Sequence, residues 1–443
     1  MEERNARSME ANMATINLLT RLIYGTSKND TLSGTAGSDI IYARSGSDLI
    51  FGSASADTIY GDDEGGANYS DTVSYANSAL GVRVDLRQVL QQDQSPYEWS
   101  AGIDDPNAPV SDAHGDMLYS IENVTGSAYD DILTGNGALN VLNGGNGNDT
   151  LNGGIDGFAD VLDGGAGVDT VDYSESGAGV NVTLDRTTTF ATVYGVFTRT
   201  ADGSVTVNGV TEDVLRNIEN VTGSAFNDTI TGNEKNNVID GGFGADIING
   251  GAGSDTIDYS GFGGEVDIDL MRTAQKGGAA EGDRLTSIEN VTGTYRNDTI
   301  RGDNGSNRLD GSSGSDTIEG RGGNDVIIGG RGADILDGGA GFDVFVYENL
   351  TDSYDPSSST RRYGFGVDTI VNFETGTDRI DLRGVDANSL TTANDAFVFT
   401  NEFTGSAGQL MYDGAKLMGD VNGDKIADFT INVTGLSHSD VML

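Results

Sequence analysis

Aspartate and asparagine recur at a step of nine residues in four runs of this chain, within the pattern GGxGxDxUx, where U is a large aliphatic residue. Carboxylate and carbonyl oxygens, typically about six to eight around one ion, are the ligands that Ca²⁺ prefers, whereas Mg²⁺ prefers a stricter octahedron with more water. The pattern therefore predicts multiple calcium sites. The predicted side-chain ligands are Asp30, Asp39, Asp48, Asp57, Asp71, Asp131, Asn140, Asp149, Asp160, Asp169, Asp228, Asn237, Asp246, Asp255, Asp298, Asn307, Asp316, Asp325, Asp334 and Asp343. The predicted ligands in the turns around them are Gly144, Asn146, Gly241, Gly250, Gly311, Gly320, Gly329 and Gly338.

The same spacing predicts the fold. Glycines at the first, second and fourth positions favour a tight turn with positive φ, which residues with a Cβ adopt only at a cost. The segment after each aspartate, such as residues 150–152, has strand propensity and one apolar side chain for the interior. If two nonapeptides complete one coil, turns on one side are 18 residues apart, so that Asp316 stacks near Asp334 and Asp325 near Asp343. We therefore predict an all-β chain folded as a right-handed parallel β-roll, a calcium β-solenoid.

The composition indicates that apolar burial alone does not hold the chain together. Its 443 residues include 66 glycines, and only 36% are hydrophobic. One aliphatic residue per nonapeptide buries too little surface to offset a backbone entropy of about 1–2 kcal/mol per residue. The 69 acidic residues outnumber the 25 basic ones, and the net charge of −44 disfavours binding to nucleic acid or to anionic membrane surfaces. Cation binding and folding are therefore expected to be one event.

The alternative is an ordinary acidic β-protein, because Asp-Gly and Asn-Gly pairs are common in hairpin turns. The number of aspartates in one phase favours the repeat. The chain has no cysteine, which excludes disulfides and thiolate metal sites.

A second, larger repeat lies between the nonapeptide runs and occurs three times. Each copy begins with DTVSY, DTVDY or DTIDY, continues through an alternating strand and a variable loop, and returns through SIENVTG or NIENVTG. Variable loops of repeat proteins usually gather on one face. The first loop, residues 87–116, contains Tyr97 and the sole tryptophan, Trp99, which are candidates for stacking on a sugar.

These observations predict nine segments. They are an N-terminal extension at 1–23, β-roll blocks at 24–75, 121–175, 218–260 and 288–347, strand-and-insertion segments at 76–120, 176–217 and 261–287, and a C-terminal domain at 348–443. The extension lacks the basic head and apolar run of a signal peptide, and translation starts at Met1 or Met13. No stretch approaches the roughly 20 apolar residues that span a bilayer.

The nonapeptides resemble those of the RTX (repeats-in-toxin) proteins. The last hundred residues are similar to the C-terminal domain of serralysin-type proteins, through VDTIVNFETGTDRIDLRGVDAN, AFVFT, GQLMYDG and GDVNGDKIADFTINVTGL in that order. The chain ends in an aspartate followed by three apolar residues, 440–443, similar to the uncleaved secretion signal of serralysins. The resemblance implies export by type I secretion machinery, a secreted extracellular location, and folding by Ca²⁺ outside the cell. The alternative for residues 440–443 is an apolar C-terminal strand.

One further loop has partial calcium spacing. Asp420, Asn422 and Asp424 follow D-x-N-x-D, but Lys425 stands where an EF-hand has glycine, and no glutamate follows at the twelfth position. A self-satisfied turn and an extra ion site both fit this loop.

The sequence predicts no enzyme. Serralysins are zinc proteases, but their HExxHxxGxxH helix cannot exist with only His114 and His438, and no GxSxG elbow is present. We expect a non-enzymatic structural, adhesive, matrix or host-interaction protein, with extracellular polysaccharide, a cell surface or further copies of itself as candidate partners. The alternative is a polysaccharide-modifying enzyme of the epimerase or lyase type, because such chemistry needs only acidic, tyrosine or lysine side chains. A membrane-active toxin is disfavoured, because no amphipathic domain precedes the repeats.

Overall fold

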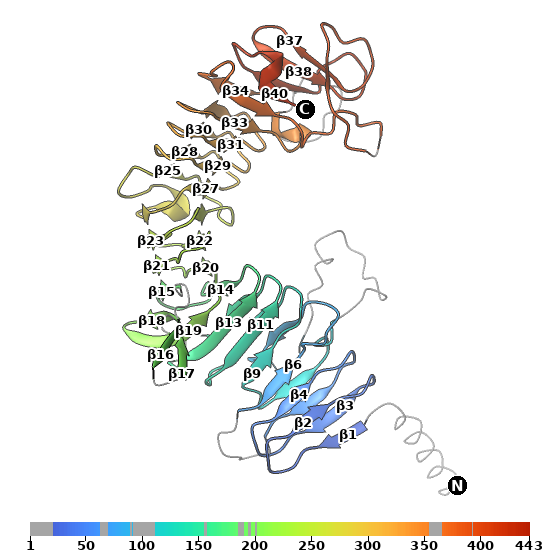
Figure 1. Cartoon of the computed structure of the whole chain (residues 1–443), viewed down its shortest axis with the longest axis vertical. Helices are drawn as coiled ribbons and strands as arrows, with labels where there is room; N and C mark the ends of the chain where they lie inside the picture. The colour runs from blue at the N-terminus through green and yellow to red at the C-terminus, as the bar shows by residue number, and fades with distance from the viewer. Residues whose placement is uncertain are drawn as a thin grey trace, which may run out of the picture. The chain divides into compact units, whose positions relative to one another are not determined.

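The computed structural model describes residues 21–62, 70–88, 91, 111–154, 157–184, 190–193, 196–199, 202–353, 366–391 and 393–443. Tyr97 and Trp99 of the first variable loop lie outside these residues. The chain divides into two compact units, Met1–Thr222 and Gly223–Leu443. Figure 1 shows short strands stacked one above another within each unit, joined by turns at both sides.

The first unit contains three stacks of parallel strands and a hairpin. The first stack is β1 (Arg21–Tyr24), β3 (Asp39–Tyr42), β5 (Thr58–Tyr60) and β8 (Met117–Tyr119). The second is β2 (Thr31–Ser33), β4 (Leu49–Phe51), β6 (Thr72–Ser74), β9 (Asn123–Thr125), β11 (Val141–Asn146), β13 (Asp160–Ala166) and β19 (Val210–Arg216), extended by the antiparallel β18 (Gly203–Val207) and β15 (Asn181–Thr183). The third is β7 (Arg83–Asp85), β10 (Ile132–Thr134), β12 (Thr150–Asn152), β14 (Thr170–Asp172) and β20 (Asn220–Thr222). The hairpin is β16 (Phe190–Val193) with β17 (Val196–Arg199).

The second unit also contains three stacks. One is β22 (Val238–Asp240), β24 (Thr256–Asp258), β27 (Asn290–Thr292), β29 (Arg308–Asp310), β31 (Val326–Ile328), β33 (Val344–Val346), β35 (Arg379–Asp381) and β40 (Val441–Met442). A short one is β21 (Thr229–Thr231), β23 (Ile247–Asn249) and β26 (Arg284–Thr286). The third is β25 (Asp267–Asp269), β28 (Thr299–Arg301), β30 (Thr317–Glu319), β32 (Ile335–Asp337), β34 (Asp368–Val371), β39 (Phe429–Asn432), β38 (Lys416–Asp420), β37 (Gln409–Tyr412) and β36 (Val398–Phe399). Three 3₁₀ turns accompany them, η2 (Gly278–Ala280), η3 (Leu350–Ser353) and η4 (His438–Asp440).

Each coil contributes one aliphatic side chain per strand to a narrow core. Ile300 pairs in register with Ile318, and Ile318 pairs with Leu336, each 18 residues further on. These three side chains are at most 1% exposed. The predicted coil of two nonapeptides is therefore confirmed, and so is the all-β parallel β-roll. In the described part of the chain, no helix is long and apolar enough to cross a bilayer.

The turns depart from the sequence prediction at the first glycine. The second and fourth positions do have positive φ, as at Gly330 (79°) and Gly332 (156°). The first position, such as Gly329, does not. Glycine is needed there for space, because a Cβ on Gly329 would lie 2.5 Å from Oδ2 of Asp334. The prediction of positive φ at all three positions was therefore wrong at the first.

The parallel stacks extend at both ends beyond the predicted blocks. The first strand begins at Arg21, inside the segment assigned to an N-terminal extension. In the second unit the stacks continue past residue 347 through β34 and β35, and β40 pairs in parallel with β35. The last apolar residues thus form a strand of the fold, with Val441 opposite Ile380.

The second unit also contains a fourth copy of the larger repeat. The sequence pattern had predicted three copies. Asn372 has φ of 54°, and the residues at the matching place of the three recognised copies, Ser120, Asn217 and Ser287, have φ of 51–52°. Tyr347 is 3% exposed, like the tyrosine that ends DTVSY in the first copy. The sequence did not reveal the fourth copy because NFET, residues 372–375, replaces the SIEN or NIEN of the others.

Candidate calcium sites

Backbone hydrogen bonds join the aspartates of neighbouring coils into rows. The N–H of Asp298 donates to Oδ1 of Asp316 (2.7 Å), and the N–H of Asp316 donates to Oδ1 of Asp334 (2.8 Å). On the other side of the roll, the N–H of Asp325 donates to Oδ1 of Asp343 (2.9 Å). The predicted stacking of residues 18 apart is therefore confirmed. Each of these hydrogen bonds uses Oδ1 of an aspartate and leaves Oδ2 available for another partner.

The predicted ligands lie inside the roll with few exceptions. Every predicted side-chain ligand except Asp30 is at most 3% exposed. Asp30, in the first described coil, is half-buried. The seven predicted first-position glycines are buried too, whereas Asn146 is exposed, so its side chain does not face a row.

The rows contain turns that we call open, in which the second carboxylate oxygen is buried and has no hydrogen-bond partner. These oxygens are Oδ2 of Asp48, Asp71, Asp149, Asp246, Asp255, Asp316, Asp325, Asp334 and Asp343. A buried polar atom without a partner is costly, and an ionised one more so. The open turns therefore call for a positive partner.

Five of the unpartnered oxygens, those of Asp71, Asp149, Asp255, Asp316 and Asp325, share their space with a backbone carbonyl oxygen. A Cβ on Gly320 would lie 2.3 Å from Oδ2 of Asp325 and 2.5 Å from the carbonyl oxygen of Gly338, in the next coil. At Gly311 the matching distances are 2.5 Å to Oδ2 of Asp316 and 2.7 Å to the carbonyl oxygen of Gly329. First-position glycines thus keep a small cradle of oxygen atoms clear.

Other turns, which we call closed, satisfy their carboxylate themselves. The N–H of Thr294 donates to Oδ2 of Asp298 (2.6 Å), and the N–H of Ser127 donates to Oδ2 of Asp131 (2.5 Å). The threonine and serine hydroxyls add further bonds to the same carboxylates. The same arrangement surrounds Asp30, Asp39 and Asp228.

The backbone at the second position separates the two kinds of turn. Positive φ occurs there in every open turn of regular length, including Arg44 (78°), Ser312 (67°) and Arg321 (74°), where the residue is not glycine. This conformation directs the N–H elsewhere: Ser312 donates to Oδ1 of Asp310 (2.9 Å) instead of to Asp316. Thr294 and Ser127 do not have positive φ. The longer turn before Asp71 lies partly outside the described residues.

The asparagines of the rows differ from the aspartates. Asn307 accepts the N–H of Asp303 (2.9 Å) at Oδ1 and donates from Nδ2 to the carbonyl oxygen of Glu289 (2.8 Å). Asn140 makes the corresponding bonds to Asn136 and to the carbonyl oxygen of Glu122. Their amides therefore satisfy the protein's own groups. The prediction that they bind metal is untested, and it is weaker than for the open aspartates.

Burial sets the electrostatics of the open turns. Desolvation raises the pKa of Asp246 and Asp316 to about 8 and that of Asp325 to about 7. Charges of neighbouring carboxylates in the row raise the pKa further, while the backbone N–H bond lowers it. In the closed turn of Asp30, hydrogen bonds from Thr26 lower the pKa, whereas burial raises the pKa in the closed turns of Asp131 and Asp298. Without a cation, burial in the open turns thus favours the neutral carboxyl, and ionisation of these groups requires a positive partner.

The donor set of the open turns fits a hard cation. At Asp316 and Asp325 the polar atoms around the cradle are carboxylate and carbonyl oxygens, the ligands of Ca²⁺. Within the described residues, no three Asp, Glu or His side chains converge as a metal site. An ion would therefore be held by the Oδ2 atoms together with first-position carbonyls, and it would supply the missing positive charge.

Sequence reasoning missed the acidic residues that continue the rows across the insertions. Asp116, Asp283 and Asp368 accept the N–H of Asp57 (2.7 Å), Asp246 (2.9 Å) and Asp334 (2.9 Å), respectively. Glu122, Glu219 and Glu289 accept the N–H of Asp71, Asp169 and Asp255, each at 2.9 Å. The repeated IEN triplet was the available signal for the glutamates.

The IEN return also supplies backbone ligands. Ser287 has φ of 51°, and its carbonyl oxygen would lie 2.2 Å from a Cβ on Gly250, beside Oδ2 of Asp255 at 2.6 Å. Ser120 and Gly61 are related in the same way, next to Oδ2 of Asp71. The return therefore takes the place of a first-position glycine carbonyl.

The D-x-N-x-D loop satisfies itself. Oδ1 of Asp420 accepts the N–H of Gly423 (2.6 Å), and Oδ2 accepts the N–H of Lys425 (3.0 Å). Asn422 donates from its side chain to Asp428 (2.9 Å). The arrangement is that of a turn, and the structure gives no further support for an ion there.

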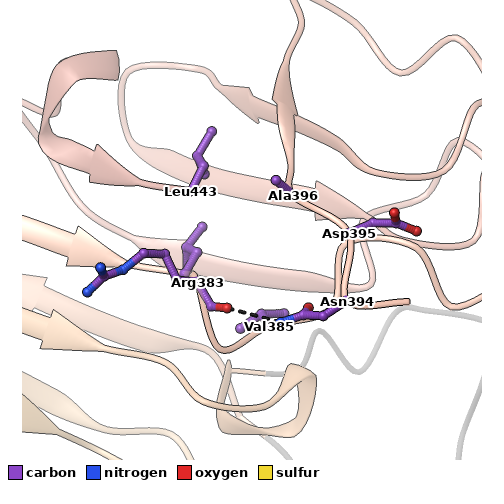
Figure 2. Close-up of a pocket in the computed structure, with 7 residues that line it drawn as sticks. Arg383, Val385, Asn394, Asp395, Ala396 and Leu443 are labelled. Atoms are coloured by element: carbon purple, nitrogen blue, oxygen red, sulfur yellow. Dashed lines mark hydrogen bonds between the residues drawn. The ribbon is translucent and has the colours of Figure 1, made fainter. Parts of the chain in front are cut away.

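Two hollows lie on the described part of the chain. One, of about 180 Å³, lies next to the last residue and has Asp395 as its only acidic lining side chain. Figure 2 shows this carboxylate pointing away from Arg383 and Leu443. The other, of about 380 Å³, has one acidic lining residue, Glu175, which pairs with Arg87. Neither offers the two facing carboxylates of acid–base glycoside chemistry.

Comparison with known protein families gives two matches, one to the nonapeptide repeats and one to the C-terminal half of the chain. The model for the RTX calcium-binding nonapeptide repeat matches four times, at residues 24–59, 125–157, 156–175 and 222–257. The model for the peptidase M10 serralysin C terminal matches residues 246–443. No curated protein matches the chain.

Among solved structures, the chain is similar to the AlgE6R3 subunit of the Azotobacter vinelandii mannuronan C5-epimerase, at 24% identity and a TM-score of 0.23. The match covers 32% of this chain and 77% of that one. Taken together, the repeat matches, the parallel coils and the C-terminal match identify the chain as an RTX calcium-binding repeat protein with a serralysin-type C-terminal domain.

Proposed function

We propose that this protein is a secreted, non-enzymatic structural protein whose β-roll forms when Ca²⁺ enters the open turns. The observation that carries the proposal is the set of buried Oδ2 atoms without partners, five of them beside a backbone carbonyl oxygen. In a calcium-poor compartment these charges repel, and the unfolded chain is favoured. In millimolar calcium the ions supply the missing charge, so binding and folding occur together.

The calcium part is tested on the full chain by far-ultraviolet circular dichroism. We expect disorder in chelator and β-structure after Ca²⁺ is added, with a midpoint of about 10⁻⁴–10⁻³ M as in extracellular modules. Mg²⁺ at the same concentration is the control and restores much less structure, because it dehydrates reluctantly. Equal spectra with and without calcium would contradict the proposal.

The export part rests on the serralysin-type C-terminal match. We expect the full chain to be exported by a type I system and to lose export when residues 440–443 are deleted. The matched control deletes no residue and changes Leu390→Ala, an exposed side chain outside these four residues. Export of the truncated chain at the full rate would remove this part of the proposal.

The non-enzymatic part rests on the two hollows, which each have a single carboxylate. Incubation of the calcium-loaded protein with alginate and other acidic polysaccharides is expected to give no shortened chains, no unsaturated ends and no epimerised residues. Any of these products would favour the polysaccharide-modifying enzyme. Polysaccharide binding, surface attachment and self-assembly are separate proposals, tested by sedimentation with each partner.

A further inference from the structure

Buried tyrosines occupy the same place in all four copies of the larger repeat, and those of the first three copies share one contact. These three end the motifs DTVSY, DTVDY and DTIDY, and each is 1% exposed. Each hydroxyl donates to Oδ2 of an aspartate beyond the insertion: Tyr75 to Asp116 (2.7 Å), Tyr173 to Asp213 (2.6 Å) and Tyr259 to Asp283 (2.9 Å). A contact that recurs across insertions of different lengths and sequences indicates a common role.

Two of the three aspartates, Asp116 and Asp283, stand at the ends of rows. Asp283 precedes β26, the last strand of the stack β21, β23 and β26, and its Oδ1 accepts the N–H of Asp246 (2.9 Å). Asp116 likewise precedes β8, the last strand of its stack. The N–H of Asp283 donates to Ala280 in its own turn instead of to a further carboxylate. The row therefore stops at this residue.

An ion at the end of a row would lack half of its cradle. In the open turns of Asp316 and Asp325 the carbonyl oxygen beside Oδ2 comes from the next coil, from Gly329 and Gly338, respectively. At the row end in the first unit, the atoms closest to a Cβ on Gly52 are those of the Tyr75 ring, the nearest at 2.2 Å. A hydroxyl donor satisfies the last carboxylate oxygen where a cation would be under-coordinated.

We propose that Tyr75 and Tyr259 are caps that end rows of calcium sites, so that Asp116 and Asp283 hold no calcium. The inference rests on the proposed function, because it assumes that the open turns bind the ion. It assigns opposite roles to two neighbours in one row: Asp246 is a ligand, whereas Asp283 belongs to the protein's own hydrogen-bond network.

The test counts bound calcium in the full chain after equilibrium dialysis, by elemental analysis per mole of protein. Asp246→Asn is expected to lower the count by at least one ion, and Asp283→Asn is expected to leave it equal to that of the wild type. A lower count in Asp283→Asn would overturn the cap while leaving calcium binding intact. A wild type without bound calcium would instead overturn the proposed function, and the cap with it.

A second variant keeps the test decisive if Asp283→Asn fails to fold. Tyr259→Phe removes only the hydroxyl, and Tyr295→Phe, at a site that is 52% exposed, is its matched control. We expect Tyr259→Phe to bind as many ions as the wild type and to melt roughly 2–4 °C lower in saturating calcium, with no shift in the control. Loss of an ion from Tyr259→Phe would make the hydroxyl a ligand and the proposal wrong.

Discussion

Thr294 closes the carboxylate of Asp298 with two donors, its backbone N–H at 2.6 Å from Oδ2 and its hydroxyl at 3.1 Å. Eighteen residues further on, Ser312 has positive φ and leaves Oδ2 of Asp316 without a partner. One backbone dihedral thus decides whether a turn satisfies itself or needs a cation.

The first prediction converts a closed turn into an open one. Thr294→Gly removes the hydroxyl and makes positive φ accessible, so we expect one additional bound calcium, measured by native mass spectrometry. Thr294→Ala is the matched control, because alanine loses the hydroxyl but disfavours positive φ. Equal ion counts in the two variants would show that the second-position backbone does not control binding.

The second prediction fills a cradle. Gly320→Ala places a Cβ 2.3 Å from Oδ2 of Asp325 and 2.5 Å from the carbonyl oxygen of Gly338. We expect a loss of about 1–3 kcal/mol in the free energy of unfolding, as for overpacking, and a higher calcium midpoint in a circular dichroism titration. Gly261→Ala, where a Cβ meets nothing within 4 Å, is the control and should behave as the wild type. Unchanged binding by Gly320→Ala would place the ions elsewhere.

The third prediction concerns pH in the absence of calcium. Burial raises the pKa of Asp246 and Asp316 to about 8, well above the roughly 3.9 of an unfolded aspartate. The folded state then binds more protons than the unfolded state, so its stability falls as pH rises from about 4 to about 8 and is fully present below that window. Calcium-free protein should therefore gain β-structure on acidification from pH 8 to pH 5. Circular dichroism of the chelated and desalted chain that does not change across this range would contradict it.

The fourth prediction concerns an ion pair that ties the third insertion to the roll. Arg321 donates to both oxygens of Asp269, at 2.8 and 2.9 Å, with side chains about one-fifth exposed. Lysine cannot reproduce the forked contact, so Arg321→Lys should lower the free energy of unfolding by about 1 kcal/mol. Arg308→Lys, at an exposed pair with Asp310, should change it by less. Chemical denaturation in saturating calcium measures both, and an equal effect would assign no special role to the fork.

The sequence determined the period and hence the coil. A step of nine with one aliphatic residue allows only a strand and a turn per nonapeptide, so the pairing of Asp316 with Asp334 followed from arithmetic. The insertions broke that arithmetic: Asp57 meets Asp116 at a separation of 59 residues, and Asp246 meets Asp283 at 37. Sequence spacing cannot identify the partner across an insertion, because insertions of different lengths return the chain to the same position in the row.

Only the tertiary structure decided which turns are open, with a carboxylate oxygen that an ion could bind. Aspartates that look identical in the pattern differ because Oδ2 is covered by Thr294 in one turn, left open beyond Ser312 in another, and capped by Tyr259 at the end of a row. The composition had already established that an acidic, glycine-rich chain needs cations to compact. The locations of those cations depend on the sign of φ at the second position of each turn and on contacts between coils. Such contacts join residues at no fixed spacing in the sequence.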